Sequence, residues 1–258
     1  MKLVTWNVNS LKVRLPQVLQ WMDLNSPDFL CLQELKLEQE KFPIKEIEAA
    51  GYQAVWAGQK TYNGVAILSK FTPADSVTNI PGYEDHQQRV VSASYDTPLG
   101  PFRVVNAYCP NGQSLESEKY PYKLAWFDAL RDWLEQEIKQ HPNLAVLGDY
   151  NIAPADEDVH NPERWKGQVL VSDAERLAFQ KLLALGLKDA FRLFIQPEKS
   201  FSWWDYRLNG YKRNAGLRID HVLLSEPLAA RCQACMIDHV PRENEQPSDH
   251  APVVAVLA

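Results

Sequence analysis

Residues 52–69 read YQAVWAGQKTYNGVAILS, and this stretch decides which kind of sheet the chain can build. It holds two short runs rich in apolar residues, YQAVWAG and GVAILS, with only a few polar residues between them. Two strands that follow each other so closely suggest an antiparallel hairpin, because parallel neighbours need a long crossover connection. The stretch therefore argues against a simple sheet in which parallel strands alternate with helices.

Runs of the same kind recur along the chain and outnumber the helical segments. Ten candidate strands result, with the sequences KLVTW, DFLCLQEL, YQAVWAG, GVAILS, RVVSASY, FRVVNAY, LAVLGDY, FSWWDY, RIDHVLL and APVVAVL. Helical patterns cover residues 16–24, about 118–140 and 172–185, and Ser172 with Glu175 forms a capping box at the start of the last. The pattern fits an α+β fold in which two sheets pack together with helices outside.

The composition is that of an ordinary globular protein. The chain has 258 residues, of which 45% are hydrophobic and 23% are charged, so wholesale disorder is excluded. No linker, internal repeat or low-complexity tract appears, and we expect one domain over residues 1–258. No apolar run of about 18 residues occurs, and the N-terminus, MKLVTWNVNS, lacks the features of a signal peptide. We therefore expect no membrane contact and a cytoplasmic location.

The cysteines do not form a disulfide framework. Cys31, Cys109, Cys232 and Cys235 lie inside apolar runs, so we interpret them as reduced core thiols. The last two form a C-x-x-C pair, but no second pair or nearby histidine completes a zinc site. On a strand, residues three apart also point to opposite faces.

The net charge of −6 argues against a general affinity for polyanions, so any contact with nucleic acid must be local. The best candidate is RLNGYKRNAGLR, residues 207–218, which holds four basic residues and no acid. A solvated loop is the alternative explanation from composition alone.

Several apolar strands end in polar residues that can bind metal or phosphate. These residues are Asn7, Asn9, Glu34, Tyr108, Asn111, Asp149, Asn151, Asp220, Asp249 and His250. Each one alone also fits a turn, a solvated acid or a core tyrosine with a wet hydroxyl. The last two lie in QPSDHAP, residues 246–252, where Pro247 and Pro252 restrict the backbone. If the strand ends converge, these side chains form a cluster.

Such a cluster would suit a particular chemistry. Carboxylates and amides with one histidine, and no cysteine nearby, favour a hard divalent cation such as Mg2+, with Mn2+ as a substitute, over zinc. The substrate would be a phosphate ester, because a metal neutralises phosphoryl oxygens while a carboxylate or histidine prepares a water.

Eight stretches carry a resemblance that spans nearly the whole chain. They are TWNVNSLKVR (5–14), LQELK (32–36), YNGVAILSK (62–70), NAYCPNG (106–112), LGDYNIAP (147–154), FSWWDYR (201–207), GLRIDHVLLS (216–225) and PSDHAPV (247–253). In this order they resemble the exonuclease III and AP endonuclease family, within the wider endonuclease, exonuclease and phosphatase superfamily. The resemblance implies a four-layer αββα sandwich of two mainly antiparallel sheets, with the active site at one edge.

The resemblance also implies roles for the strand-end residues. Glu34 would be the principal Mg2+ ligand, with Asn7 beside it and Asp249 completing or adjoining the site. Asp149 would prepare or stabilise the attacking hydroxide, and Asn151 would hold it or the phosphate in line. The candidate metal ligands are thus Asn7, Glu34, Asp149, Asn151, Asp249 and His250.

The phosphate side of the site follows from the same resemblance. His250 would donate to a non-bridging phosphoryl oxygen or act as a base, and Asp220 would fix its ring and favour the imidazolium. Tyr108 and Asn111 would contact the scissile phosphate. The catalytic candidates are Tyr108, Asp149, Asn151, Asp220 and His250.

DNA contacts are expected on the other side of the site. Trp203, Leu217 and Ile219 match positions that line a pocket for a flipped, base-free deoxyribose in similar enzymes, while Trp204 is better explained as a core aromatic. The basic stretch would lie beside the DNA. The candidate DNA-binding residues are Asn111, Trp203, Arg207, Lys212, Arg213, Leu217, Arg218 and Ile219.

Three positions depart from the strongest family pattern. Asn9 stands where some relatives carry Asp, and Leu217 stands where some carry Trp. Leu170 lies where efficient AP endonucleases tend to have a small residue, so its bulk would hinder an internal abasic site more than a 3′ terminus.

We therefore expect a Mg2+-dependent, monomeric DNA repair hydrolase that acts on double-stranded DNA with abasic sites or blocked 3′ ends. Its activities would be 3′-5′ exonuclease and 3′-phosphatase, with weaker incision at abasic sites. One alternative is a superfamily member that hydrolyses a small-molecule or lipid phosphoester, against which FSWWDYR and GLRIDHVLLS argue. Another is a DNA-binding relative without catalysis, which the retained acids and histidine make improbable.

Overall fold

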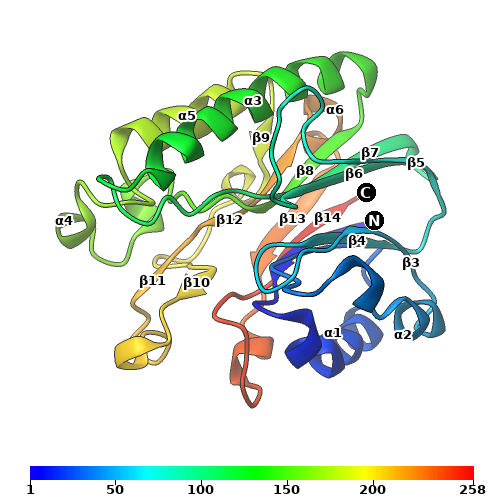
Figure 1. Cartoon of the computed structure of the whole chain (residues 1–258), viewed down its shortest axis with the longest axis horizontal. Helices are drawn as coiled ribbons and strands as arrows, with labels where there is room; N and C mark the ends of the chain where they lie inside the picture. The colour runs from blue at the N-terminus through cyan, green and yellow to red at the C-terminus, as the bar shows by residue number, and fades with distance from the viewer.

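The computed structural model describes residues 1–258 and contains two six-stranded sheets packed face to face, with helices on both outer faces (Figure 1). The first sheet has the order β13-β14-β1-β2-β4-β3, and the second has the order β5-β6-β7-β8-β12-β9. A two-stranded sheet, β10-β11, projects at one end. The predicted α+β class and four layers are confirmed.

The bounds of the elements are as follows. The first sheet consists of β1 (Lys2–Asn7), β2 (Phe29–Gln33), β3 (Gln53–Ala57), β4 (Val65–Ser69), β13 (Cys232–Ile237) and β14 (Val253–Leu257). The second consists of β5 (Pro73–Thr78), β6 (Val90–Thr97), β7 (Gly100–Tyr108), β8 (Leu144–Asp149), β9 (Lys188–Asp189) and β12 (Asp220–Leu224). The small sheet pairs β10 (Trp203–Trp204) with β11 (Gly216–Leu217). The helices are α1 (Leu11–Asn25), α2 (Ile44–Ala49), α3 (Lys119–Gln140), α4 (Pro162–Trp165), α5 (Asp173–Leu183) and α6 (Glu226–Ala229). Short 3-10 helices cover Gln39–Lys41, Asp156–Asp158, Ala190–Leu193, Arg207–Asn209 and Val240–Glu243.

Three apolar cores separate the four layers. The central core takes side chains from both sheets, for example Ile67 of β4 and Val104 of β7. The outer face of the first sheet packs on α1 and α2, and that of the second packs on α3 and α5 (Figure 1). None of these helices combines the length and the apolar character needed to cross a membrane.

Each sheet contains a single parallel pair, and this arrangement sets the location of the site. Strand β1 pairs parallel with β2, and β7 pairs parallel with β8, while all other neighbours within the two sheets are antiparallel, including the predicted β3–β4 hairpin. The connections that carry α1 and α3 join these parallel pairs, as parallel strands require. The register places Tyr108 beside Asp149 and Asp149 beside Asp220, so these strand ends share one edge.

A buried polar contact joins the two sheets just below that edge. Asn106 of β7 donates hydrogen bonds across the interface to the carbonyls of Leu32 and Ala66, both at 2.8 Å. Its oxygen accepts one from Gln33 Nε2 at 2.7 Å. Buried polar groups of this kind favour one relative placement of the sheets, because any shift leaves them unpaired.

The sequence patterns missed four strands and misplaced one helix start. Strand β5 is polar and largely exposed at a sheet edge, β13 is a half-exposed edge strand with a bulge, and β9 and β11 have two residues each. Helix α1 begins at Leu11 and accommodates Pro16 in its interior, whereas the pattern predicted a start at that proline. The Ser172–Glu175 capping box is present as predicted.

Candidate active site

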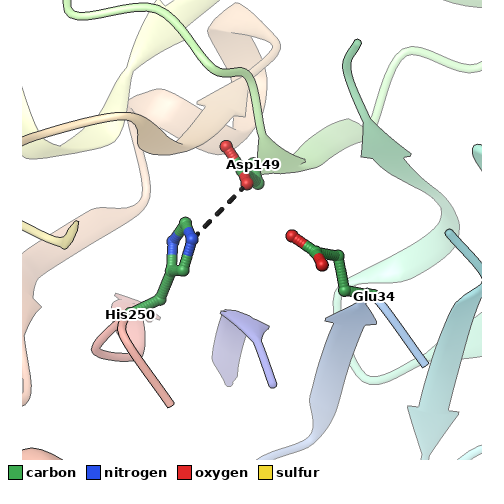
Figure 2. Close-up of side chains that lie close together, drawn as sticks. All are labelled: Glu34, Asp149 and His250. Atoms are coloured by element: carbon green, nitrogen blue, oxygen red, sulfur yellow. Dashed lines mark ion pairs between the residues drawn. The ribbon is translucent and has the colours of Figure 1, made fainter. Parts of the chain in front are cut away.

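Three side chains from different strands point into one space at the shared sheet edge (Figure 2). Glu34 follows β2, Asp149 ends β8 and His250 precedes β14. Their ligand atoms all lie within 4.8 Å of one another. The predicted convergence of strand ends is therefore present.

Asn7 and Tyr108 hold the two carboxylates in place. The Asn7 side-chain amide donates to Glu34 Oε1 and to Asp149 Oδ2, both at 2.9 Å. The Tyr108 hydroxyl donates to the same Glu34 oxygen at 2.9 Å. Because both donors sit on strand ends, the carboxylates are fixed by the sheets rather than by mobile loops.

Two residues at this edge of the sheets, Glu34 and Asn151, have an unusual backbone conformation. Glu34 has φ of 53° and Asn151 has φ of 50°, in the left-handed region that side chains rarely adopt. For Asn this conformation is tolerated, but for Glu it costs about 1–3 kcal/mol. Hydrogen bonds from Ser10 N to Glu34 O at 2.8 Å and from Leu35 N to Gly64 O at 3.1 Å hold the strained segment.

His250 and Asp220 form the orienting pair that the resemblance implied. His250 Nδ1 lies 2.9 Å from Asp220 Oδ2. Its Nε2 lies 3.7 Å from Asp149 Oδ2, and Figure 2 marks this ion pair. Burial lowers the pKa of His250, but the charges of Asp220 and Asp149 outweigh this effect and raise it to about 10. The ring is therefore an imidazolium at neutral pH, with Nε2 directed into the site as a donor.

The environments of the two carboxyl groups shift their pKa values in opposite directions. Burial raises the pKa of Asp149 to about 7, although the neighbouring His250 partly offsets the rise. Burial also acts on Glu34, but Lys36 Nζ at 2.8 Å from its Oε2 outweighs it and keeps the pKa of Glu34 below its usual value. One carboxylate is thus set up to stay charged and the other to exchange a proton near neutral pH.

The donor set fits a hard divalent cation. Two carboxylates, bridged by an amide, offer oxygen ligands, and no thiol lies in the group. His250 is better suited to donate to an anion than to ligate a cation, because its ring is protonated. The residues present could therefore hold a cation through the carboxylate oxygens of Glu34 and Asp149. The predicted ligand Asn7 instead turns its amide nitrogen toward both carboxylates, and its oxygen accepts a hydrogen bond from Asn9 N at 3.0 Å.

Two predicted ligands lie at the margin of this group. Asn151 Oδ1 accepts from Asn111 Nδ2 at 2.9 Å, and Asn151 Nδ2 donates to Cys109 O at 3.0 Å. The Asp249 carboxylate accepts from Asn9 Nδ2 at 2.9 Å and from Trp203 Nε1 at 3.0 Å, and it lies outside the three-residue cluster. Both residues adjoin the site, but their side chains form hydrogen bonds with residues of neighbouring loops.

A cavity of about 720 Å³ opens beyond Trp203. Its lining residues include Arg164, Arg207 and Arg213, which supply positive charge next to the cluster. Arg207 is paired with Asp205, whereas Arg164 and Arg213 form no ion pair. The cavity has the charge expected of a surface that binds a phosphate backbone.

Lys212 lies apart from the other basic residues of its loop. It lines a different cavity, of about 570 Å³, together with Lys199, Tyr211 and Met236. The predicted stretch 207–218 therefore does not present one continuous basic face.

The prediction that Arg218 contacts DNA is wrong for this structure. Its side chain is only 1% exposed, and its guanidinium lies 2.6 Å from Asp158 and 2.8 Å from Asp189. Both acids come from other parts of the chain, so the sequence of the loop gave no sign of this pairing. Arg218 supports the fold beneath the site.

Leu217 and Ile219 are buried together with Leu170. The three side chains belong to one apolar cluster with Val159, against which Trp203 packs. Leu170 is 4% exposed and has φ of 78°. Trp203, Leu217 and Ile219 therefore lie together, and Leu170 packs in the same cluster.

Sequence reasoning assigned no role to two residues of the site. Lys36 is part of the LQELK stretch, yet its ion pair with Glu34 depends on the strained turn that brings them together. Lys123 is fully buried on α3, four residues before Phe127 on the apolar stripe, and a lysine at such a position is a signal that could have been used.

The comparisons with known proteins agree with this geometry. A family model described as the endonuclease/exonuclease/phosphatase family matches residues 4–250. The chain belongs to this family. Among family members, Exodeoxyribonuclease III of Haemophilus influenzae is 38% identical over 264 residues, which cover 99% of this chain and 99% of that protein.

Two solved structures of similar proteins extend the comparison. A Neisseria 3′ phosphatase, NExo, bound to a product DNA hairpin is 46% identical, with a TM-score of 0.97 over 100% of this chain and 99% of that chain. A structure described as the 3′-5′ exonuclease NExo from Neisseria meningitidis is 47% identical, with a TM-score of 0.96 over the same shares. The resemblance to exonuclease III and the expectation of a hydrolase of that type are confirmed.

Proposed function

We propose that this chain is a Mg2+-dependent hydrolase that trims the 3′ ends of double-stranded DNA, as a 3′-5′ exonuclease and a 3′-phosphatase. The observation that carries the proposal is the cluster of Glu34, Asp149 and the Asp220-paired His250 beside an arginine-lined cavity. Relatives described as exonuclease and 3′ phosphatase support it. We further propose that it works as a single-domain monomer and that Mn2+ can substitute.

The chemistry follows from the protonation of each group. Asp149 accepts a proton from the attacking water, since its pKa is raised to about 7 by burial. The new bond from the water oxygen to phosphorus replaces the bond from phosphorus to the 3′ oxygen of the DNA strand, and that oxygen leaves and takes up a proton from solvent. His250 donates from Nε2 to the phosphoryl oxygen where charge develops, and Asp220 keeps it charged and oriented. A divalent cation held by Glu34 would neutralise phosphoryl charge and lower the pKa of a bound water. Asn151 and Asn111 orient the phosphate beside these groups.

A side-by-side assay tests the function. Three duplexes, bearing a 3′-phosphate, a recessed normal 3′ end and one internal abasic site, should all be cleaved with Mg2+, the first two fastest. EDTA should abolish all three activities, and Mn2+ should restore them. Cleavage that survives EDTA would contradict the metal requirement, and hydrolysis of a phospholipid or inositol phosphate without cleavage of DNA would replace the proposed substrate.

Leu170 is proposed to set the balance between substrates. Its side chain fills the apolar cluster next to Trp203, where a base-free sugar would be accommodated. Leu170→Gly should raise incision at an abasic site by about tenfold relative to 3′-phosphate removal. Lost burial should destabilise the protein, partly offset because glycine suits φ of 78°.

The matched control is Leu182→Ala, which removes buried apolar volume on α5 away from the site. It should lower the melting temperature without changing the ratio of the two activities. An unchanged ratio in the Leu170→Gly variant would remove the steric explanation.

A further inference from the structure

Lys123 forms a buried junction behind the candidate site. It lies on α3 with a fully buried side chain. Its ammonium donates to the backbone carbonyls of Asn151 at 2.7 Å and Asn111 at 3.1 Å, and to Glu175 Oε1 at 2.5 Å. An ammonium has three protons, so these three acceptors use all of them.

Glu175 completes the junction on α5. Its Oε1 also accepts from Leu170 N at 3.0 Å, and its Oε2 accepts from Ser172 N at 3.1 Å and from Ser172 Oγ at 2.6 Å. With Lys123, four donors occupy the four acceptor positions of the carboxylate. No hydrogen-bonding capacity of either charged group is left over.

Three loops of the site therefore meet at one ion pair. Lys123 fixes the carbonyls of the loops that carry Asn111 and Asn151, and Glu175 fixes the backbone of the loop that carries Leu170. The Asn151 N–H in turn donates to Asp149 Oδ1 at 2.9 Å, so the junction reaches the reacting cluster through one residue.

The loop around residue 111 is also packed on this lysine. A side-chain carbon at Gly112 would lie 3.2 Å from Lys123 Cδ, which is shorter than an ordinary van der Waals contact. Stability alone does not explain a buried ion pair, because well-packed apolar residues of similar volume are often as stable or more so. What an apolar pair could not do is hold two carbonyls and a backbone N–H at fixed relative positions.

We propose that the Lys123–Glu175 pair is a positioning element that sets where Asn111, Asn151 and Leu170 stand relative to Asp149. The inference rests on the proposed function of the site. Neither residue touches the reacting atoms, and both act through the backbone of the residues that do.

The test is the double variant K123M/E175Q, which removes both charges together so that no buried charge is left unpaired. With a 3′-phosphate duplex, kcat should fall by at least about 30-fold while KM stays within about threefold, since the basic cavity is untouched. The assay is run well below the melting temperature of the variant, and circular dichroism verifies its fold.

The control is R103M/E137Q. This pair is also buried and also involves α3, because Glu137 lies on that helix, 2.8 Å from Arg103 Nε. Arg103 lies on β7 five residues before Tyr108, away from the end of the strand that carries the site. It should lower the melting temperature and leave kcat within about twofold, because no loop of the site depends on it.

Two results would overturn the inference. One is a folded K123M/E175Q variant with kcat within threefold of wild type, and the other is an equal loss of kcat in the control. If the double variant does not fold at the assay temperature, the same criteria apply to E175Q alone. Wild-type protein that cleaves no DNA substrate would refute the proposed function instead, so the two failures are distinguishable.

Discussion

Replacing His250 by Ala is expected to lower kcat for 3′-phosphate removal by about 10³-fold, with little change in KM. The ring donates from Nε2 into the site, and its charge depends on Asp220 at 2.9 Å. Without the imidazole, the charge that develops on the phosphoryl oxygen loses its nearest protein donor. Steady-state kinetics on a duplex with a 3′-phosphate measure the effect.

The matched control is His141→Ala, at the end of α3 and away from the cluster, which should keep wild-type kcat. Asp220→Asn should give a large part of the loss, because the ring would no longer be held as an imidazolium. A His250→Ala protein that retains kcat within about tenfold would mean that the histidine is structural, and the assignment of the phosphate donor would have to move.

Replacing Glu34 by Ala is expected to lower kcat by about 10³-fold. The variant assayed with Mg2+ should therefore behave like the wild-type protein assayed with EDTA. Glu34 offers the carboxylate that is kept charged by Lys36, and it is fixed by Asn7 and Tyr108. The fold should persist, because its ion pair with Lys36 is partly exposed and contributes little.

Metal binding provides a second measurement that does not depend on turnover. Calorimetry with Mn2+ should detect binding to wild-type protein and to the control Glu40→Ala, which changes an exposed acid in the 3-10 helix Gln39–Lys41. It should detect much weaker binding to the Glu34→Ala protein. Equal Mn2+ affinity in all three proteins would place the cation on other residues.

Patterns in the sequence were sufficient for the layers of the fold, and they failed mainly at polar edges. Hydrophobic runs marked the strands of five or more residues that are buried on both faces, such as β2 and β8. Strand β5 was missed because an edge strand in water needs no apolar alternation, and its residues are mostly exposed.

In the site, too, contacts that family motifs encode could be predicted, whereas contacts between distant parts of the chain could not. His250 and Asp220 could be paired from family motifs, whereas the charges around Arg218 could not, since Asp158 and Asp189 reach it only through the tertiary fold. The strained turn at Glu34 could not be predicted either, because no glycine stands at that position to indicate a positive φ. Its φ of 53° is held by backbone hydrogen bonds with Ser10 and Gly64, which lie elsewhere in the sequence. Local sequence patterns therefore predict which residue types could take part in the chemistry, whereas the tertiary packing determines which of them are accessible to a substrate.

The buried Asn106 contact between the sheets has a consequence for how the protein can be observed during folding. Glu34 and Asn7 come from one sheet, and Asp149, Tyr108 and Asp220 come from the other. Hydrolysis therefore requires both sheets to be docked in register, whereas circular dichroism responds to each sheet alone. Recovery of activity after dilution from denaturant would time the joining of the two halves, and Asn106→Ala should delay that recovery more than it delays the return of secondary structure.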